Sequence, residues 1–247
     1  MIEFIDIHKR FGTNVVLEGV SITVDTGQVL YIIGASGAGK SVLVKHLVGL
    51  LRPDSGRIIL DGEDITWLDE RGFYPIRRKC AMVFQNSTLF DSMTLLENVM
   101  LPLRKHQKMS RKDAAVAAHA KLELVNMERE AHQYPSAIGD GLRKRVAIAR
   151  ALTMDPQFVI FDEPTTGLDP MAASTVDDLI RSLRADAGVT SIVVSHDLRS
   201  IFTVADRVAM IYQGQIRLDS TPEGFRSSDD PIIHQFVNGL PEGPMAV

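Results

Sequence analysis

The chain has 247 residues, 45% apolar and 23% charged, which is typical of a folded domain with a substantial core and excludes a disordered or fibrous chain. Its formal net charge of -4 gives no support to nucleic-acid binding, and its single cysteine, Cys80, excludes an intrachain disulfide. No window holds the roughly 18 apolar residues of a membrane span, and Glu3 and Asp6 interrupt any leader-like run, so we expect a cytosolic protein or one docked to a membrane through partners.

Short β-rich runs recur along the chain. Several are continuously apolar, as strands buried on both faces of a parallel sheet are. They are Ser21–Val24, Val29–Ile33, Arg57–Leu60, Cys80–Phe84, Phe158–Phe161, Ser191–Val194 and Arg207–Ile211. Helical patterns lie between some of them, and together they predict a layered α/β domain with a largely parallel sheet.

Two of these helices have clear starts. One is predicted from Val42 to Leu51. The other begins at Asp169-Pro170, an N-cap followed by proline in the first turn, and continues in an apolar stripe. The stripe consists of Val176, Leu179, Ile180 and Leu183.

The middle and the end of the chain differ from this pattern. From about Asn86 to Tyr134 strand signals are weak, and a capping-box pattern at Ser110 followed by an alanine-rich run to about Val125 predicts a helix. The end, NGLPEGPMAV, is too rich in glycine and proline for a regular helix or central strand. We therefore expect a core of residues 1–85 and 141–226, a helical subdomain of residues 86–140 and a tail of residues 227–247.

A phosphate-binding loop follows the predicted strand Val29–Ile33. The sequence GASGAGKS fits the pattern GxxxxGKS and opens a helix, which is the context that this motif requires. Glycines let backbone N–H groups turn toward phosphate oxygens, Lys40 reaches the β and γ phosphates, and the Ser41 hydroxyl ligates Mg²⁺. A chance glycine turn would not place strand, motif and helix in register. The predicted nucleotide-binding residues are Gly34, Ala35, Ser36, Gly37, Ala38, Gly39, Lys40, Ser41 and Val42.

Acidic and polar side chains follow three other predicted strands. Asp162 and Glu163 end the strand Phe158–Phe161 at the edge where α/β sheets bind ligands. One carboxylate can hold the Mg²⁺ shell and the next can polarise a water, although an acidic strand end that feeds a turn is common by itself. Gln85 and His196 would be structural if they stood alone. Their positions relative to the loop make them candidates for sensing the γ-phosphate.

The order GASGAGKS, VFQ, GDGLRKRVAIARAL, FVIFDEP, TTGLD and SHD resembles the ATP-binding cassette (ABC) ATPases over nearly the whole chain. The resemblance implies a P-loop NTPase (RecA-like) core with an antiparallel β element near the N-terminus, and it implies ATP and Mg²⁺ as ligands. It implies that Phe11 stacks on adenine and that Gln85 joins the metal to the transporter interface. It further implies a catalytic Glu163 and a switch residue His196. The implied D-loop is Thr166, Gly167, Leu168 and Asp169.

The family's five-residue signature, usually Leu-Ser-Gly-Gly-Gln, aligns with Ile138 to Leu142. Family members form dimers, in which this segment binds the ATP of the other subunit. Gly139 lacks the serine hydroxyl, Asp140 brings a negative charge toward a phosphate, and Gly141 is retained. Two interpretations stay open: the aspartate weakens closure, or it stabilises the start of a helix and turns away from the nucleotide. The short basic cluster Arg143-Lys144-Arg145 is interpreted as a solvated face.

One cassette and no heptad run favour a transporter subunit over the soluble ABC proteins. The stretch NSTLFDSMTLLENVMLPLR after Gln85 and the ending HQFVNGLPEGPM resemble the ATPases of Mla-type and related Mce lipid transporters. This implies a homodimer, an integral-membrane permease, an Mce-domain lipid-binding protein and in some systems a STAS-domain subunit, on the cytoplasmic face of the inner membrane. The alternatives are the ATPase of a small-solute importer, or a nucleotide-gated scaffold that hydrolyses weakly.

The tail offers apolar anchors between glycines and prolines. We expect the segment from about Pro231 to be ordered by a neighbouring ATPase subunit rather than by its own core. The anchors are Ile232, Ile233, Phe236 and Val237.

Overall fold

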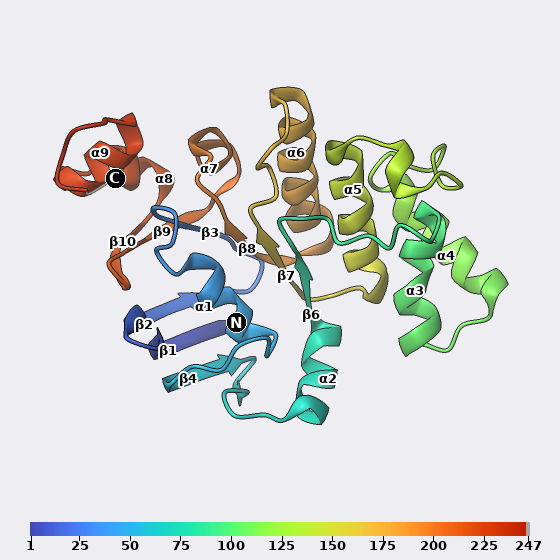
Figure 1. The fold of residues 1–247 in the computed structure, drawn as a ribbon, viewed down its shortest axis with the longest axis horizontal. Helices are drawn as coiled ribbons and strands as arrows, with labels where there is room; N and C mark the ends of the chain where they lie inside the picture. Colours follow the sequence, from blue (N-terminus) through green and yellow to red (C-terminus); the bar gives the residue numbers. More distant parts are fainter. Residues whose placement is uncertain (246–247) are drawn as a thin grey trace.

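The computed structural model describes residues 1–245, which form two β-sheets covered by helices (Figure 1). The larger sheet has the strand order β10-β9-β3-β8-β7-β6, and all its neighbouring strands are parallel except the antiparallel pair β10–β9. The predicted, mostly parallel sheet is therefore confirmed. Its strands are β3 (Val29–Ile33), β6 (Cys80–Val83), β7 (Phe158–Asp162), β8 (Thr190–Val194), β9 (Arg207–Tyr212) and β10 (Gln215–Ser220).

The smaller sheet is antiparallel, in the order β2-β1-β4-β5, and forms the expected β element near the N-terminus. Its strands are β1 (Ile2–Phe11), β2 (Asn14–Val24), β4 (Ser55–Leu60) and β5 (Glu63–Asp64). None of the β-rich runs predicted from the sequence covers β1, and one of them, Ser21–Val24, covers only the end of β2. The pairing of these two strands shifts register between Phe4 and Ile7, and Asp6 has a φ of 53°. Such irregularities break the alternation by which a strand is recognised.

The helices fill the connections between the strands. α1 begins at Lys40, directly after the left-handed Gly39, and ends at Leu47, so it starts and stops earlier than the predicted helix from Val42 to Leu51. The early end coincides with Gly49, which has a φ of 68°. The helices are α1 (Lys40–Leu47), α2 (Glu70–Lys79), α3 (Leu95–His106), α4 (Arg111–Glu123), α5 (Asp140–Ala151), α6 (Pro170–Ala187), α7 (Leu198–Val204), α8 (Pro222–Arg226) and α9 (Pro231–Asn238).

The central strand β3 lies between two apolar layers. Leu30 and Ile32 belong to the core cluster that includes α1 and the smaller sheet. Val29, Tyr31 and Ile33, on the opposite face of the strand, belong to the cluster that includes α6 and α7. Every side chain of β3 is therefore buried, as its continuous apolar run predicts.

The expected helical insertion is present as α3 and α4, whose apolar cluster also includes Val146 and Ala149 of α5. In Figure 1 these helices lie at the end of the molecule opposite α9. α3, which the sequence interpretation did not mark, begins with a complete capping box between Thr94 and Glu97. The fully buried Asn98 holds the preceding loop through hydrogen bonds with the backbone of Phe90 and Met93.

The tail packs on the chain's own core, so the prediction that a neighbouring subunit orders it instead is wrong. Ile233 is fully buried in the cluster that includes β9 and α8. The irregular segment after α9 is held by Gln235, whose Oε1 accepts a hydrogen bond from the Met245 N–H at 2.7 Å. Residues 246 and 247 of the predicted tail lie outside the described part of the chain. Between residues 1 and 245, no helix combines the length and the apolar character needed to span a bilayer.

This packing predicts that Ile233→Ala lowers the free energy of unfolding by about 2–5 kcal/mol, because the substitution opens a cavity in the core. The matched control is Leu240→Ala in the same tail, where the side chain is 42% exposed and a change within about 0.5 kcal/mol is expected. Denaturant unfolding measures both. If the unfolding curve of Ile233→Ala is unchanged and its dimerisation is weaker, the tail is ordered by the neighbouring subunit and not by the chain's own core.

Candidate nucleotide site

A cavity of about 650 Å³ lies at the carboxyl edge of the large sheet, where α/β folds bind ligands. All the nucleotide-binding and catalytic residues predicted from the sequence line it, whereas the predicted metal ligand Asp162 does not. They are Phe11, the whole segment Gly34–Val42, Gln85, Glu163 and His196, joined by Val16 and Phe236. The signature residues Gly139, Asp140 and Gly141 and the D-loop residues do not line this cavity.

Glycine is sterically required at two positions of the phosphate loop. A Cβ on Gly34 would lie 2.3 Å from the backbone oxygen of Ile211, and a Cβ on Gly39 would lie 2.7 Å from a methyl of Leu17. Both residues also have positive φ values, of 145° and 99°. The loop is thus pressed against β9 and β2, and its residues line the cavity at the start of α1, where helix N-termini favour anions.

Lys40 is enclosed by the loop that it follows. Its Nζ donates hydrogen bonds to the carbonyl oxygens of Gly34 at 2.8 Å and Ala35 at 3.0 Å, and the residue is 7% exposed. Burial lowers the pKa of Lys40, and the carboxylates of Glu163 and Asp162 act to raise it. A desolvated cation on the floor of an anion cradle attracts phosphate oxygens strongly.

Ser41 and Asp162 bring two oxygen ligands together beside the loop. The Ser41 hydroxyl donates to Asp162 Oδ1 at 2.6 Å, and Asp162 is 6% exposed at the end of β7. Hydroxyl and carboxylate oxygens are ligands that suit Mg²⁺, which usually takes few protein ligands and completes its shell with water and phosphate. Accordingly, no cluster of three or more His, Cys, Asp or Glu residues able to hold a metal occurs in residues 1–245.

Glu163 is contacted by side chains from two different loops. Its Oε2 lies 2.9 Å from His196 Nδ1 and accepts a hydrogen bond from the Thr166 hydroxyl at 2.8 Å. Its backbone N–H donates to Val194 at 2.9 Å, and its φ of 54° is unusual for a residue other than glycine. This turn directs the carboxylate toward the cavity while the side chain stays 13% exposed.

Lys144 corrects the sequence interpretation. It was assigned to a solvated basic face, but it is 5% exposed, and its Nζ donates to the backbone oxygens of Thr166 at 2.6 Å and Glu163 at 3.3 Å. Burial lowers its pKa, while Asp140 and Glu163 act to raise it. Lys144 therefore fastens helix α5 to the turn between Glu163 and Thr166. A basic residue inside a basic run gave no signal of this contact.

The signature segment caps and opens α5. Gly139 is the N-cap residue, and Asp140 lies in the first turn with its side chain 74% exposed and 3.4 Å from the Arg143 guanidinium. A carboxylate in the first turn is favoured by the helix dipole. A Cβ on Gly139 would meet no atom within 4 Å, so the position has room for serine. Contact of Asp140 with the ATP of a second subunit stays a prediction.

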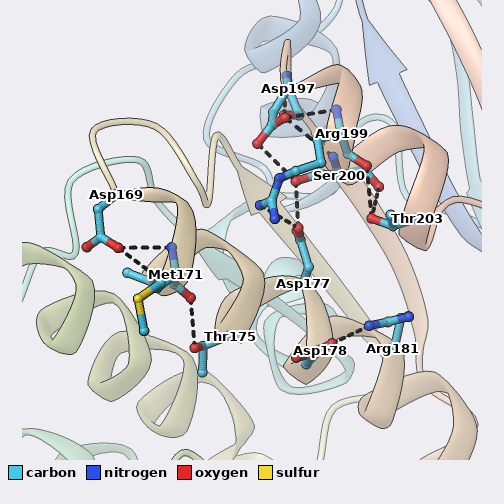
Figure 2. Close-up of polar contacts among 12 residues, drawn as sticks. Asp169, Met171, Thr175, Asp177, Asp178, Arg181, Asp197, Arg199, Ser200 and Thr203 are labelled. Carbon is cyan, nitrogen blue, oxygen red and sulfur yellow. Dashed lines mark hydrogen bonds and ion pairs between the residues drawn. The ribbon is translucent and has the colours of Figure 1, made fainter.

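The predicted D-loop leads into α6. Figure 2 shows the carboxylate of Asp169 accepting from the start of this helix. The donors are the backbone N–H groups of Met171 at 2.9 Å and Ala172 at 3.0 Å. Gly167, two residues earlier, has a φ of 77° and turns the chain toward this cap.

Comparison with known proteins agrees with this geometry. The sequence profile of the family described as "ABC transporter" matches residues 17–166. The chain belongs to this family. A dimeric structure titled as a post-hydrolysis state of the ATP-binding cassette MJ0796 bound to ADP and Pi superposes with a TM-score of 0.83 at 30% identity, covering 90% of this chain and 99% of that one.

Three curated relatives are similar over most of the chain. The probable ribonucleotide transport ATP-binding protein mkl of Mycobacterium tuberculosis is 37% identical, over 100% of this chain and 68% of that protein. The intermembrane phospholipid transport system ATP-binding protein MlaF of Escherichia coli is 32% identical, over 99% and 91%. The methionine import ATP-binding protein MetN of Rhizobium johnstonii is 40% identical, over 87% and 59%. The chain is therefore the ATP-binding, ATP-hydrolysing subunit of an ABC transporter, and ABC ATPases work as dimers with membrane permeases.

Glu163→Gln is expected to preserve ATP binding and to lower phosphate release on the order of 10²–10⁴-fold, because the amide keeps the shape of the side chain but accepts no proton. Nucleotide binding and phosphate release are measured on the same preparation. Glu63→Gln, in the exposed strand β5, is the matched control and should behave like the wild type. Phosphate release at the wild-type rate from Glu163→Gln would remove this residue from catalysis.

Restoring the usual signature with Gly139→Ser and Asp140→Gly is expected to raise ATP turnover. The change adds a hydrogen-bond donor and removes a negative charge, which Arg143 and solvent already screen in part. We expect about 1 kcal/mol of closed-state stability, or roughly fivefold in turnover where closure limits the rate. Steady-state ATPase activity is the measurement. Equal or lower turnover would favour Asp140 as a helix-start residue only.

Proposed function

We propose that this chain energises the transport of phospholipids or other lipids between the inner and outer membranes. The observation that carries the proposal is the similarity to MlaF, which extends over 99% of this chain and 91% of that protein. It thus includes both stretches whose sequences resemble Mla-type ATPases, the region after Gln85 and the tail. In this proposal the chain is held peripherally on the cytoplasmic face of the inner membrane by a permease, with an Mce-domain protein and in some systems a STAS-domain subunit.

The proposed reaction assigns a role to each part of the cavity. Phe11 stacks on adenine, the loop N–H groups and Lys40 bind the phosphates, and Glu163 accepts a proton from the attacking water. His196, within hydrogen-bond distance of Glu163, orients that carboxylate. Mg²⁺, which Ser41, Asp162 and Gln85 would hold, supplies positive charge to the phosphates when bound. The signature residues of one subunit complete the site of the other, so ATP favours the closed dimer.

A second cavity supports docking to a permease. It measures about 680 Å³ and has an apolar floor with a basic rim. The region after Gln85 supplies part of its wall, where the Arg150 guanidinium donates to the backbone oxygens of Ser87 at 3.3 Å and Thr88 at 3.0 Å. The rim residues are Arg77, Arg78, Lys105, His106 and Arg150, and no acidic residue lines the cavity. Such a groove fits an apolar helix that carries acidic side chains.

This charge pattern predicts that Lys105→Glu weakens the association with the permease by about tenfold. The new glutamate at the rim of the groove would repel the acidic side chains proposed for the permease helix. Lys112→Glu on α4 makes the same change outside the groove and is the matched control. Co-purification of the permease and the rate of ATP-driven transport are measured, together with nucleotide binding by the isolated chain, which should not change. An equal effect of both variants would count against this docking surface.

The transport assignment is tested with the complete complex, purified with its permease and reconstituted into vesicles that contain a labelled phospholipid. ATP should drive transfer of the lipid to an acceptor, and a complex that carries Glu163→Gln should transfer none. Methionine and ribonucleotides are tested in parallel, because MetN and mkl are named for these cargoes. ATPase stimulation and uptake with either solute, without lipid transfer, would replace the lipid assignment with a small-solute importer.

A further inference from the structure

Helices α6 and α7 begin after two different loops, and each loop has a side chain in contact with Glu163. α6 follows the D-loop segment that ends at Asp169, and α7 follows directly after His196 and Asp197. Val176 and Ile180 of α6 share one apolar cluster with Ile201 of α7. Apolar contacts hold two helices together without fixing their register, because they have little directional preference. A hydrogen bond in the same interface can fix the register of the two helices, because its geometry is directional.

Asp177 forms this polar contact. It lies two turns into α6, and its side chain is 4% exposed. Its Oδ2 accepts hydrogen bonds from the Ser200 hydroxyl at 2.9 Å and from the Arg199 guanidinium at 3.2 Å, both on α7 (Figure 2). Its Oδ1 is buried without a hydrogen-bond partner among residues 1–245. A buried carboxylate with an unpaired oxygen lowers stability, so packing alone does not explain an aspartate here.

The neighbouring Asp178 makes the contrast clear. Its side chain is 60% exposed and pairs with Arg181 on the same helix (Figure 2). An exposed pair of this kind is worth little to stability. Of two consecutive aspartates, one therefore points into the interface with α7 and the other points to solvent.

A chain of contacts connects Asp177 with Glu163 through Ser200, Asp197 and His196. The Ser200 hydroxyl lies 3.1 Å from Asp197 Oδ2, and with one proton it donates to one carboxylate at a time. Asp197 caps α7 by accepting from the N–H groups of Arg199 at 3.0 Å and Ser200 at 3.4 Å. The preceding residue, His196, lies 2.9 Å from Glu163. The start of α7, and with it the histidine, is thus tied to α6.

We propose that Asp177 is a positioning residue for ATP hydrolysis, which fixes α7 against α6 and so keeps His196 aligned with Glu163. The proposal rests on the proposed roles of these two residues. It places the D-loop and the switch histidine on one rigid unit, because Asp169 caps the same helix that carries Asp177. A shift of α6 at the subunit boundary would then move the histidine of the same subunit.

The test measures kcat and KM for ATP with the full-length chain. Asp177→Asn and Ser200→Ala should each lower kcat about tenfold and leave KM within twofold, because neither residue lines the cavity. Asp178→Asn, the matched control, should leave both constants unchanged. Asp177→Leu guards against a folding defect. Arg199 is 45% exposed and can be solvated, and the Ser200 hydroxyl keeps Asp197 as an acceptor, so the thermal midpoint should stay close to that of the wild type while kcat still falls.

A His196→Ala background separates positioning from general stability. By itself His196→Ala tests the proposed role of the histidine, and it should slow hydrolysis. Asp177→Asn added to it should lower single-turnover hydrolysis by less than twofold, because the residue that it positions is already absent. A full tenfold loss in this background, or wild-type kcat in the Asp177→Leu variant, would overturn the proposal. Wild-type hydrolysis by His196→Ala itself would overturn the role of the histidine and the proposal with it.

Discussion

The burial of strand β3 on both faces is the constraint on which the site depends. Its side chains alternate between two apolar clusters, so the strand has no freedom to slide or rotate without exposing apolar surface to water. Because the neighbouring strands β8 and β9 run parallel to it, the loops that follow all three strands emerge at one edge. The phosphate loop and His196 are thereby brought to one cavity from positions far apart in the chain. The steric contact of Gly34 with Ile211 then fixes how closely the loop approaches β9.

Local patterns could be predicted from the sequence, and contacts between distant segments could not. The phosphate loop, the Asp162-Glu163 strand end and the Asp169 cap are each encoded by residues within a few positions of one another. The alternation of β1 was hidden by its register shifts, and α3 has Pro102 within its span, a residue that usually ends a helix.

The contacts that escaped prediction join residues that give no signal by themselves. Lys144 looked like one member of a basic run, because nothing near it in sequence shows that its ammonium meets the backbone of Thr166. Phe236 lines the nucleotide cavity from a helix more than two hundred residues after Phe11, and only the folding of the tail onto β9 brings it there. Asp177 follows the stripe residue Val176, and its burial depends on the position of α7.

The path of the chain between the two cavities has a mechanical consequence. Phe84 lines the groove with the basic rim, and Gln85, the next residue, lines the nucleotide cavity. Adjacent Cα atoms across a trans peptide are about 3.8 Å apart and cannot be stretched. A displacement of Phe84 at the groove wall therefore also moves the backbone of Gln85, so the two cavities are linked through a single peptide bond.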